Sequence, residues 1–280
     1  MIDYDITPKY LWWRAKKIAY NLVPSQKLRQ KLKNAMPRKW DVISYSEKNL
    51  QKYHSILKNY PDVLSAKETL ALAMQKGSFS RIGDGEFNNI IGLRNSFNSP
   101  DGKLAARLKE ICEQGSTDKC VVCLNNYKLP KGAAGYTWFL YHGARRMEGV
   151  LEKVKFSQPT YGEAYFLVQI ASKGAEGLNQ IKQLWNGQKV LIVCNAKSPL
   201  RQDPLNFFDN TVQKEFLQVP DKNAFEHYDE IIKAIRKYDT SWRIYLEVGA
   251  TASVLAWDLS KEGYHALDMG DIYKRILTEM

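Results

Sequence analysis

Short apolar segments alternate with helical patterns over most of this 280-residue chain. The segments with the length and composition of buried strands cover residues 79–82, 120–124, 189–194 and 243–248. Helical patterns cover residues 65–76, 103–113, 137–150, 177–185, 224–238 and 252–261. This alternation predicts an α/β fold, with a Rossmann-like, largely parallel sheet flanked by helices. In such a sheet, ligands bind outside the carboxyl ends of the strands.

Composition excludes several classes of protein. The chain is 44% hydrophobic, enough for a substantial buried core, and it has no run of about 18 apolar residues that would predict a membrane span. Its first residues lack the order of a signal peptide. Four scattered cysteines do not make a secreted disulfide framework, and Cys120 and Cys123 should face opposite sides of a strand. We therefore expect a folded globular protein of the cytoplasm.

The segment Arg81-Ile82-Gly83-Asp84-Gly85-Glu86 places two carboxylates two positions apart, directly after a predicted strand. The glycines permit a tight or positive-φ turn. Asp84 and Glu86 carry the hard oxygen ligands that Mg²⁺ or Mn²⁺ prefers, and Arg81 is suited to meet a phosphate beside the metal. An ordinary Asp-Gly turn is the alternative, although it leaves Arg81 and Glu86 unexplained. From these six residues alone, metal–phosphate chemistry and a structural turn stay equally open.

Two later strand ends also carry groups suited to phosphate. The segment 249–252 precedes a predicted helix, so free backbone amides and the Thr251 hydroxyl would be offered to a docked phosphate. After the strand at 189–194, Lys197 and Arg201 have the charge to grip a diphosphate, although both also fit a solvated loop. The chain has neither G-x-G-x-x-G nor G-x-x-x-x-G-K-[ST], which disfavours the dinucleotide-binding and P-loop classes.

Positive charge is concentrated at the amino terminus. Residues 1–40 hold ten Lys or Arg against two Asp, and the whole chain has a net charge of +11. Leu11, Ala15, Ile18 and Leu22 recur at helical spacing, which predicts a basic amphipathic helical arm within residues 1–60, ahead of a main domain at 61–280. Residues 9–39 would suit an anionic membrane surface, with the tryptophans at headgroup level. A helix packed on the protein's own core is the alternative, and no nucleic-acid partner is expected because no recognised nucleic-acid module follows.

Several segments, in order, resemble those of bacterial glycosyltransferases of the GT-D fold, a family first catalogued as a domain of unknown function. Residues 80–87 are similar to the family's R-x-G-D-G-E segment, 205–210 to its N-D-L-F-x-N-like segment, 220–225 to P-x-x-N-A-F, 249–259 to G-P-T-A-x-V-L-A-x-D-L, and 266–270 to the end of the domain. The resemblance covers roughly residues 65–273. The departures are Gly270-Asp271 for Gly-His, Tyr273-Lys274-Arg275 for an acidic tail, and Cys194-Asn195 for Glu-Gly.

The resemblance implies a sugar transfer from a nucleoside diphosphate sugar, expected to be a UDP-sugar, to a hydroxyl of a bacterial surface glycan, glycolipid or glycoprotein. Asp84 and Glu86, the family's D-x-E pair, would hold Mn²⁺ or Mg²⁺ at the diphosphate. The residues expected to bind substrate are Arg81, Gly83, Gly85, Lys197, Arg201, Asn206, Asn223 and Thr251. Asp271 is the candidate base that takes the acceptor proton, with Asp268 and Glu163 as alternatives.

Two other functions are compatible with the same residues. A metal-dependent phosphohydrolase would use the same carboxylates and basic groups to activate water instead of a sugar hydroxyl. A non-catalytic protein that binds nucleotide sugars or glycans would stack Trp138, Phe139 and Tyr141 on a sugar. Phosphate release without an acceptor would indicate the hydrolase, and binding without turnover would indicate the binding protein.

Overall fold

The structure is a computed structural model that describes residues 6–37, 39–44, 46–128 and 143–279. Trp138, Phe139 and Tyr141, named above as sugar-stacking side chains, lie outside these residues. The chain forms two compact units, one of Met1–Tyr60 with Tyr127–Glu152 and the other of Pro61–Asn126 with Lys153–Met280. The division thus differs from the expected 1–60 and 61–280, because residues 127–152 join the first unit.

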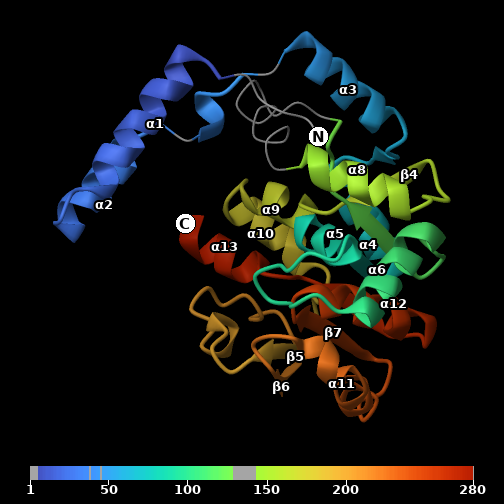
Figure 1. Cartoon of the computed structure of the whole chain (residues 1–280). Coiled ribbons are helices and arrows are strands. Elements are labelled where there is room, and N and C mark those ends of the chain that lie inside the picture. The colour runs from blue at the N-terminus through green and yellow to red at the C-terminus, as the bar shows by residue number, and fades with distance from the viewer. Residues whose placement is uncertain (1–5, 38, 45, 129–142, 280) are drawn as a thin grey trace. The chain divides into compact units, whose positions relative to one another are not determined.

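The second unit contains a sheet flanked by helices (Figure 1). Among the described residues this sheet is parallel and has eight strands in the order β1-β4-β3-β2-β8-β7-β5-β6. The strands are β1 (Asp62–Val63), β2 (Ser78–Ile82), β3 (Cys120–Leu124), β4 (Thr160–Glu163), β5 (Lys189–Asn195), β6 (Gln213–Val219), β7 (Trp242–Glu247) and β8 (His265–Asp268). The four expected strands are confirmed within one residue at each end, and the expected parallel α/β fold is confirmed with them.

Helices cover both faces of the sheet. One face carries α4 (Ala66–Lys76), α9 (Phe166–Ala171), α10 (Ala175–Lys182) and α13 (Ile272–Glu279). The other carries α11 (Tyr228–Ile235) and α12 (Ala250–Lys261), with α6 (Gly102–Gln114) against α12. The alternation of side chains along a strand separates the two cores: Val190 and Ile192 of β5 join the first, whereas Leu191 and Val193 join the second.

Local sequence signals explain several element ends. Ser65 and Glu68 form the expected capping box at the start of α4, and Gly77, with a φ of +84°, ends it in a left-handed conformation. The helical pattern at 224–238 divides into the 3-10 helix η3 (Ala224–His227) and α11. Further short elements are α5 (Asp84–Ile90), α8 (Ala144–Lys153) and the 3-10 helix η2 (Pro199–Arg201). All four cysteines are buried free thiols, so Cys120 and Cys123 form no redox pair.

The first unit contains α1 (Pro8–Asn21), α2 (Gln26–Ala35), the 3-10 helix η1 (Lys39–Asp41), α3 (Glu47–Lys58) and all of α8 but its last residue. Tyr10 and Trp13 of α1 pack with Val42 and Ile43 in a small core, and the Trp13 Nε1–H donates to the carbonyl oxygen of Pro37 at 2.8 Å. Within the described part of the chain, no helix has the length and apolar composition needed to cross a bilayer.

Candidate functional site

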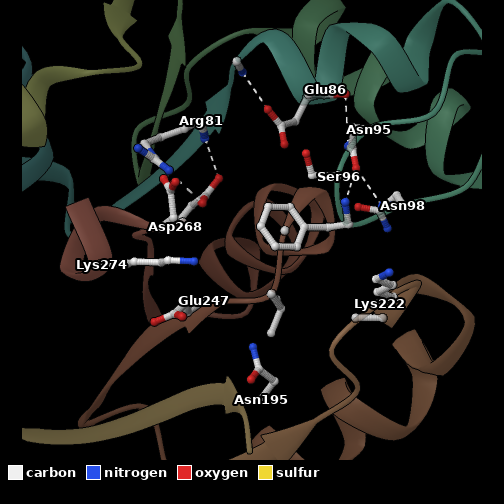
Figure 2. Close-up of a pocket in the computed structure, with 18 of the residues that line it drawn as sticks. Arg81, Glu86, Asn95, Ser96, Asn98, Asn195, Lys222, Glu247, Asp268 and Lys274 are labelled. Atoms are coloured by element: carbon white, nitrogen blue, oxygen red, sulfur yellow. Dashed lines mark hydrogen bonds and ion pairs between the residues drawn. The ribbon is translucent and has the colours of Figure 1, made fainter. Parts of the chain in front are cut away.

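A pocket of about 480 Å³ opens at the carboxyl ends of the parallel strands of the second unit (Figure 2). Residues at or just after the ends of β2, β3, β5, β7 and β8 line it, together with the loops after β6 and α5. β2 and β8 are neighbours in the sheet, but the chain continues from β2 to β3 on one side and reaches β8 from β7 on the other. Open α/β sheets bind ligands where the strand order reverses in this way.

Arg81, near the end of β2, is held by groups from other segments. Its backbone N–H donates to Asp268 Oδ2 at 2.8 Å, and its Nη1 donates to the carbonyl oxygen of Ala164 at 3.2 Å. Its Nε lies 3.8 Å from Asp268 Oδ1, and only 14% of the side chain is exposed. Gly270, with a φ of +53°, leaves the room for this arrangement, because a Cβ there would overlap Arg81 Nη2. The guanidinium is therefore fixed beside a buried carboxylate (Figure 2).

The segment Gly83-Asp84-Gly85-Glu86 begins a helix, so the expected glycine-hinged turn is wrong. Gly83, with a φ of −99°, is the N-cap of α5, and Gly85 lies inside that helix. Glu86 Oε2 turns back to accept a hydrogen bond from the Gly83 N–H at 2.8 Å, and Asp84 Oδ1 accepts one from Asn125 Nδ2 at 2.9 Å. The free N–H groups of a helix N-terminus stabilise acidic side chains in the first turn, which explains why this segment is helical.

Glu86 and Asp268 place negative charge at this end of the pocket. Burial raises the pKa of Glu86 to about 7, and the nearby Asp268 acts in the same direction. Burial also raises the pKa of Asp268, while Arg81 opposes that rise. Two carboxylates in one partly buried site favour either a shared proton or a bound cation.

Glu247, the last residue of β7, lines the pocket and is half-buried. Ser198 Oγ lies 3.1 Å from each of its carboxylate oxygens. Burial raises the pKa of Glu247 to about 7; Asp271 also raises it, whereas the Ser198 hydroxyl and the Lys274 ammonium lower it. A carboxyl with this pKa is close to half-ionised at neutral pH, which suits a group that accepts and releases a proton.

The loop after α5 forms a polar wall of the pocket (Figure 2). Asn95 Oδ1 accepts hydrogen bonds from the N–H groups of Phe97 and Asn98 at 2.8 and 2.6 Å. Asn223, after β6, ties a second segment to this loop: its N–H donates to the Phe97 carbonyl at 2.9 Å, and its Oδ1 accepts from the Ser99 N–H at 2.9 Å. Asn98 is 4% exposed, and its Oδ1 has no hydrogen-bond partner among the described residues. An unsatisfied buried acceptor at a pocket is suited to a ligand's donor group.

The pocket brings together most of the residues that the sequence singled out. Those that line it are Arg81, Gly83, Asp84, Gly85, Glu86, Lys197, Asn223 and Asp271. Asp271 Oδ1 lies 2.8 Å from Arg275 Nε, and Lys197 Nζ lies 3.5 Å from Asp221 Oδ2. Of the two alternative bases, Asp268 lines the pocket and Glu163 does not.

Arg201, Asn206 and Thr251, which were also expected to bind substrate, do not line this pocket. Arg201 ends the 3-10 helix η2, where its Nε donates to the carbonyl oxygen of Asn195 and its guanidinium lies over the Phe216 ring. Asn206 is an exposed residue with a φ of +48°. Thr251 is fully buried within α12, so the amino end of that helix reaches the pocket only through Gly249 and the preceding residues.

Several pocket-lining side chains were not expected from the sequence, among them Asn98, Lys222, Glu247 and Lys274. Glu247 offered one signal, because it is a charged residue at the carboxyl end of an apolar strand, where such sheets bind ligands. Lys222 lies in a polar segment that resembles any solvated loop, and Lys274 stands among buried apolar residues of α13. Only the tertiary fold brings Lys274 close to Glu247 and Lys222 to the opposite side of the pocket (Figure 2).

The carboxylates suit a hard divalent cation in part. Asp84, Glu86, Asp268, Asp271, Asp221 and Glu247 all line the pocket. Among the described residues, however, no three His, Cys, Asp or Glu side chains converge as a metal-binding group. Mg²⁺ in phosphate-binding enzymes is commonly held by one or two carboxylates together with substrate phosphates. The donor set therefore fits an ion that takes part of its coordination from a bound diphosphate.

Comparison with known proteins identifies the family. The family model described as "Glycosyltransferase GT-D fold" matches residues 79–276. The chain belongs to the GT-D glycosyltransferase family. A probable glycosyl transferase, Gly, of Streptococcus gordonii is 30% identical over 223 residues, which are 75% of this chain and 32% of that protein. The glycosyltransferase GlyD of Streptococcus pneumoniae serotype 4 is 26% identical over 224 residues, 75% of this chain and 27% of that protein.

Solved structures agree with this GT-D assignment. A glycosyltransferase from Streptococcus sanguinis, described as domain of unknown function 1792, superposes with a TM-score of 0.66 at 28% identity and covers 78% of this chain and 85% of its own. A second structure of that domain, described as a distinct glycosyltransferase fold, has a TM-score of 0.70 at 27% identity, with 81% and 86% covered. The resemblance stated from the motifs is therefore confirmed. The matched part of the chain spans only 32% and 27% of the length of these two relatives.

Proposed function

We propose that this GT-D protein transfers a sugar from a nucleoside diphosphate sugar, with UDP as the expected nucleotide, to a hydroxyl of a bacterial surface glycan, glycolipid or glycoprotein. The observation that carries the proposal is the pocket at the carboxyl ends of β2 and β8, which combines cationic and acidic side chains. Its cations are Arg81, Lys197, Lys222, Lys274 and Arg275. The four buried free cysteines support a cytoplasmic location, where thiols stay reduced.

The nucleotide and its phosphates would occupy different parts of the pocket. Asn98 offers a buried Oδ1 acceptor that a nucleobase or ribose donor can satisfy, and Asn223 holds the Asn98 loop in place through its bonds to Phe97 and Ser99. Exposed lysines nearby carry the charge to bind phosphate oxygens. Lys222 follows β6 and Lys274 belongs to α13, so the diphosphate would lie between these two segments.

Glu247 is the group we propose as the base. It would accept the proton of the acceptor hydroxyl as that oxygen forms a bond to the anomeric carbon, while the bond from that carbon to the phosphate oxygen breaks and the nucleoside diphosphate leaves with the electron pair. Its raised pKa of about 7 supports this role. Asp271, the base expected from sequence, lines the same pocket but is paired with Arg275.

Asp84 and Glu86 would hold Mn²⁺ or Mg²⁺. When bound, such an ion neutralises negative charge that develops on the leaving diphosphate. The hydrogen bonds from Asn125 and from the Gly83 N–H orient the two carboxylates before any ligand arrives. Arg81, fixed by Asp268, supplies permanent positive charge close to the same end of the pocket.

A donor screen tests the proposal. The purified chain, with Mn²⁺ or Mg²⁺, is incubated with a panel of nucleotide sugars, and the release of nucleoside diphosphate is recorded with and without a chelator. We expect release from one donor, loss of that release in the double variant Asp84→Ala, Glu86→Ala, and weaker donor binding by calorimetry when the metal is removed. The matched control is Asp229→Ala, Glu230→Ala, two exposed acidic residues in the first turn of α11, which should retain activity.

The products separate this function from its rivals. Nucleoside diphosphate with the sugar on an acceptor, or with slow release of free sugar, supports a transferase. Inorganic phosphate released from nucleotides or sugar phosphates would instead identify a phosphohydrolase. Donor binding without turnover, even with acceptor glycans present, would identify a binding protein, and the absence of both binding and release would refute the proposal.

A further inference from the structure

Helix α1 has two apolar faces, and only one of them is buried. Tyr10 and Trp13 pack against Val42 and Ile43, which accounts for one side of the helix. The residues on the other side remain exposed: Leu11 by 54%, Ile18 by 60% and Leu22, which caps the helix, by 76%. Their spacing of seven and then four residues places them in a single line along the helix. The unit's own small core therefore does not account for this second face.

Helix α2 extends the exposed apolar surface. None of its ten residues is buried. Leu28 and Leu32, four positions apart on one face, are 47% and 38% exposed. A helix this short is marginal in water without packing against something apolar. The exposed apolar stripe, defined as Leu11, Trp12, Ile18, Leu22, Leu28 and Leu32, thus belongs to two consecutive helices that lack a matching apolar surface for it among the described residues of their unit.

The charge around the exposed apolar stripe has one sign. Residues 6–37 contain eight Lys or Arg and no Asp or Glu. The basic residues of the two helices are Lys9, Arg14, Lys16, Lys17, Lys27, Arg29, Lys31 and Lys33. A second copy of the same surface would meet this charge with like charge. The partner that fits must therefore be apolar within and negatively charged at its surface.

Trp12 shows how the apolar and basic groups are combined. Its ring is half exposed, and Lys16 Nζ lies 3.7 Å from the ring centroid. Tryptophan prefers the boundary between hydrocarbon and water, where its ring is buried and its N–H stays hydrated. A lysine beside it keeps its ammonium at the level of lipid phosphates while its methylenes cover apolar surface.

We propose that α1 and α2 form a docking surface for an anionic lipid bilayer, lying in the headgroup region with the exposed apolar stripe inserted and the lysines at the lipid phosphates. Surface-lying amphipathic helices bind by this combination of apolar burial and attraction to anionic lipid. A nucleic acid would bind the basic residues but would leave the exposed leucines without an apolar partner. Leu11, Ile18 and Leu22 do not face the small core of their own unit, which Tyr10 and Trp13 join instead.

The test is sedimentation of the full chain with vesicles, read without any sugar substrate and therefore independent of the proposed transferase activity. One set contains phosphatidylcholine alone, and the other contains about one quarter phosphatidylglycerol. We expect co-sedimentation with the anionic vesicles, little with the neutral ones, and loss of binding at high salt. Equal binding to both sets, or none to either, would overturn the proposal.

Two double variants separate the apolar and electrostatic contributions. Leu11→Ser, Ile18→Ser should weaken binding by about tenfold or more, since each removes apolar surface that would insert. Lys27→Gln, Lys31→Gln should weaken it by about fivefold per lysine. The matched control is Met74→Ser, Val212→Ser, which changes side chains of the second unit that are 42% and 72% exposed and should bind as the unchanged chain does.

Other results would assign the surface to another partner. Loss of binding in the lysine variant alone, with the Leu11, Ile18 variant unaffected, would indicate charge attraction without insertion and overturn the proposal. Self-association in light scattering without vesicles that disappears in the Leu11, Ile18 variant would indicate a second copy. Unfolding of that variant by circular dichroism would show that these side chains belong to a core, which also contradicts the proposal.

Discussion

At the residue scale, the position of the Arg81 side chain requires that residue 270 has no Cβ. The Arg81 guanidinium, partly neutralising the buried Asp268, occupies the space where any other residue at position 270 would place its Cβ. Gly270 also has a φ of +53°, which L-residues with side chains adopt at a cost. Two separate constraints thus act on one glycine beside the pocket, and a substitution there should affect both folding and the position of the Arg81 guanidinium in the pocket.

We expect Gly270→Ala to lower the free energy of unfolding by about 2 kcal/mol more than Gly187→Ala, measured by urea denaturation. Gly187 has a φ of +67° with nothing within 4 Å of its Cβ position, so alanine there meets only the backbone penalty of about 1–2 kcal/mol. Equal losses in the two variants would show that Arg81 moves aside freely. In that case the guanidinium is not fixed as described.

Glu247→Gln should reduce the transfer rate by a factor of about 10² to 10⁴, while the affinity for nucleoside diphosphate stays near that of the unchanged chain. The base must be ionised, so the rate at saturating donor should rise with pH and level off above about 7, the raised pKa of Glu247. The Glu247→Gln variant should lack this rise of the rate with pH. Asp271→Asn, measured in parallel, should keep the same dependence of the rate on pH. If Asp271→Asn loses this dependence and Glu247→Gln keeps it, Asp271 is the base.

Ser198→Ala provides a second, milder change at the same carboxylate. The Ser198 hydroxyl donates to Glu247 and lowers its pKa, opposing the effect of burial. Without it the pKa of Glu247 rises, so the pH at which the rate levels off should move upward. If the rate of Ser198→Ala depends on pH in the same way as that of the wild-type chain, another group sets the pH at which the rate levels off.

At the scale of elements, the sequence was most informative where a segment is buried or capped. The apolar runs of β3, β5 and β7 and the Ser65–Glu68 capping box of α4 identified these elements because each satisfies a local rule. Strand β6 was missed because it is an edge strand with mostly polar, partly exposed residues, and β4 and β8 are only four residues long. Only the pairing with neighbouring strands makes these segments strands.

The site was predictable to a similar extent. The segment 81–86 identified one side of the pocket, although two glycines around Asp84 suggested a turn where the helix α5 begins. The other side depends on which strands are neighbours: Glu247 of β7 and Ser198 after β5 meet because β5 and β7 pair in register, Cys194 opposite Glu247. Register between distant strands is not encoded in any local pattern, so these groups escaped sequence reasoning.

Adjacent tryptophans on α1 allow a prediction for that element. Trp13 is 7% exposed and bonded to Pro37, whereas Trp12 is 51% exposed. Trp13→Ala should destabilise α1 by about 3 kcal/mol or more, seen as faster hydrogen exchange of its amides. Trp12→Ala should change the opening free energy of α1, as measured by hydrogen exchange, by less than about 0.5 kcal/mol. It should instead weaken vesicle binding. Equal effects on exchange would contradict the two-faced description of the helix.

At the scale of the whole molecule, the two units carry different properties. Every residue that lines the pocket belongs to the second unit, and the exposed apolar stripe with its basic border belongs to the first. The proposed sugar-nucleotide binding and the proposed surface attachment should therefore be separable by mutation. If an acceptor is anchored in the same bilayer, attachment would raise its effective concentration at the enzyme without any added contact in the pocket.

A chain lacking residues 1–36 tests this separation. It should bind nucleoside diphosphate with the affinity of the full chain in calorimetry, because no pocket-lining residue is removed, and it should no longer sediment with anionic vesicles. Circular dichroism would verify that the sheet remains folded. A large loss of nucleotide affinity in the folded, shortened chain would mean that the first unit contributes to the site.

The most direct test of the central claim is a crystal structure of the chain with nucleoside diphosphate and Mn²⁺, prepared under conditions in which calorimetry shows binding. We expect the diphosphate to lie at the carboxyl ends of β2 and β8, with Asp84 and Glu86 close to the metal and Asn98 bonded to the nucleoside. A nucleotide ordered elsewhere on the chain, or no measurable affinity for any nucleoside diphosphate, would contradict it.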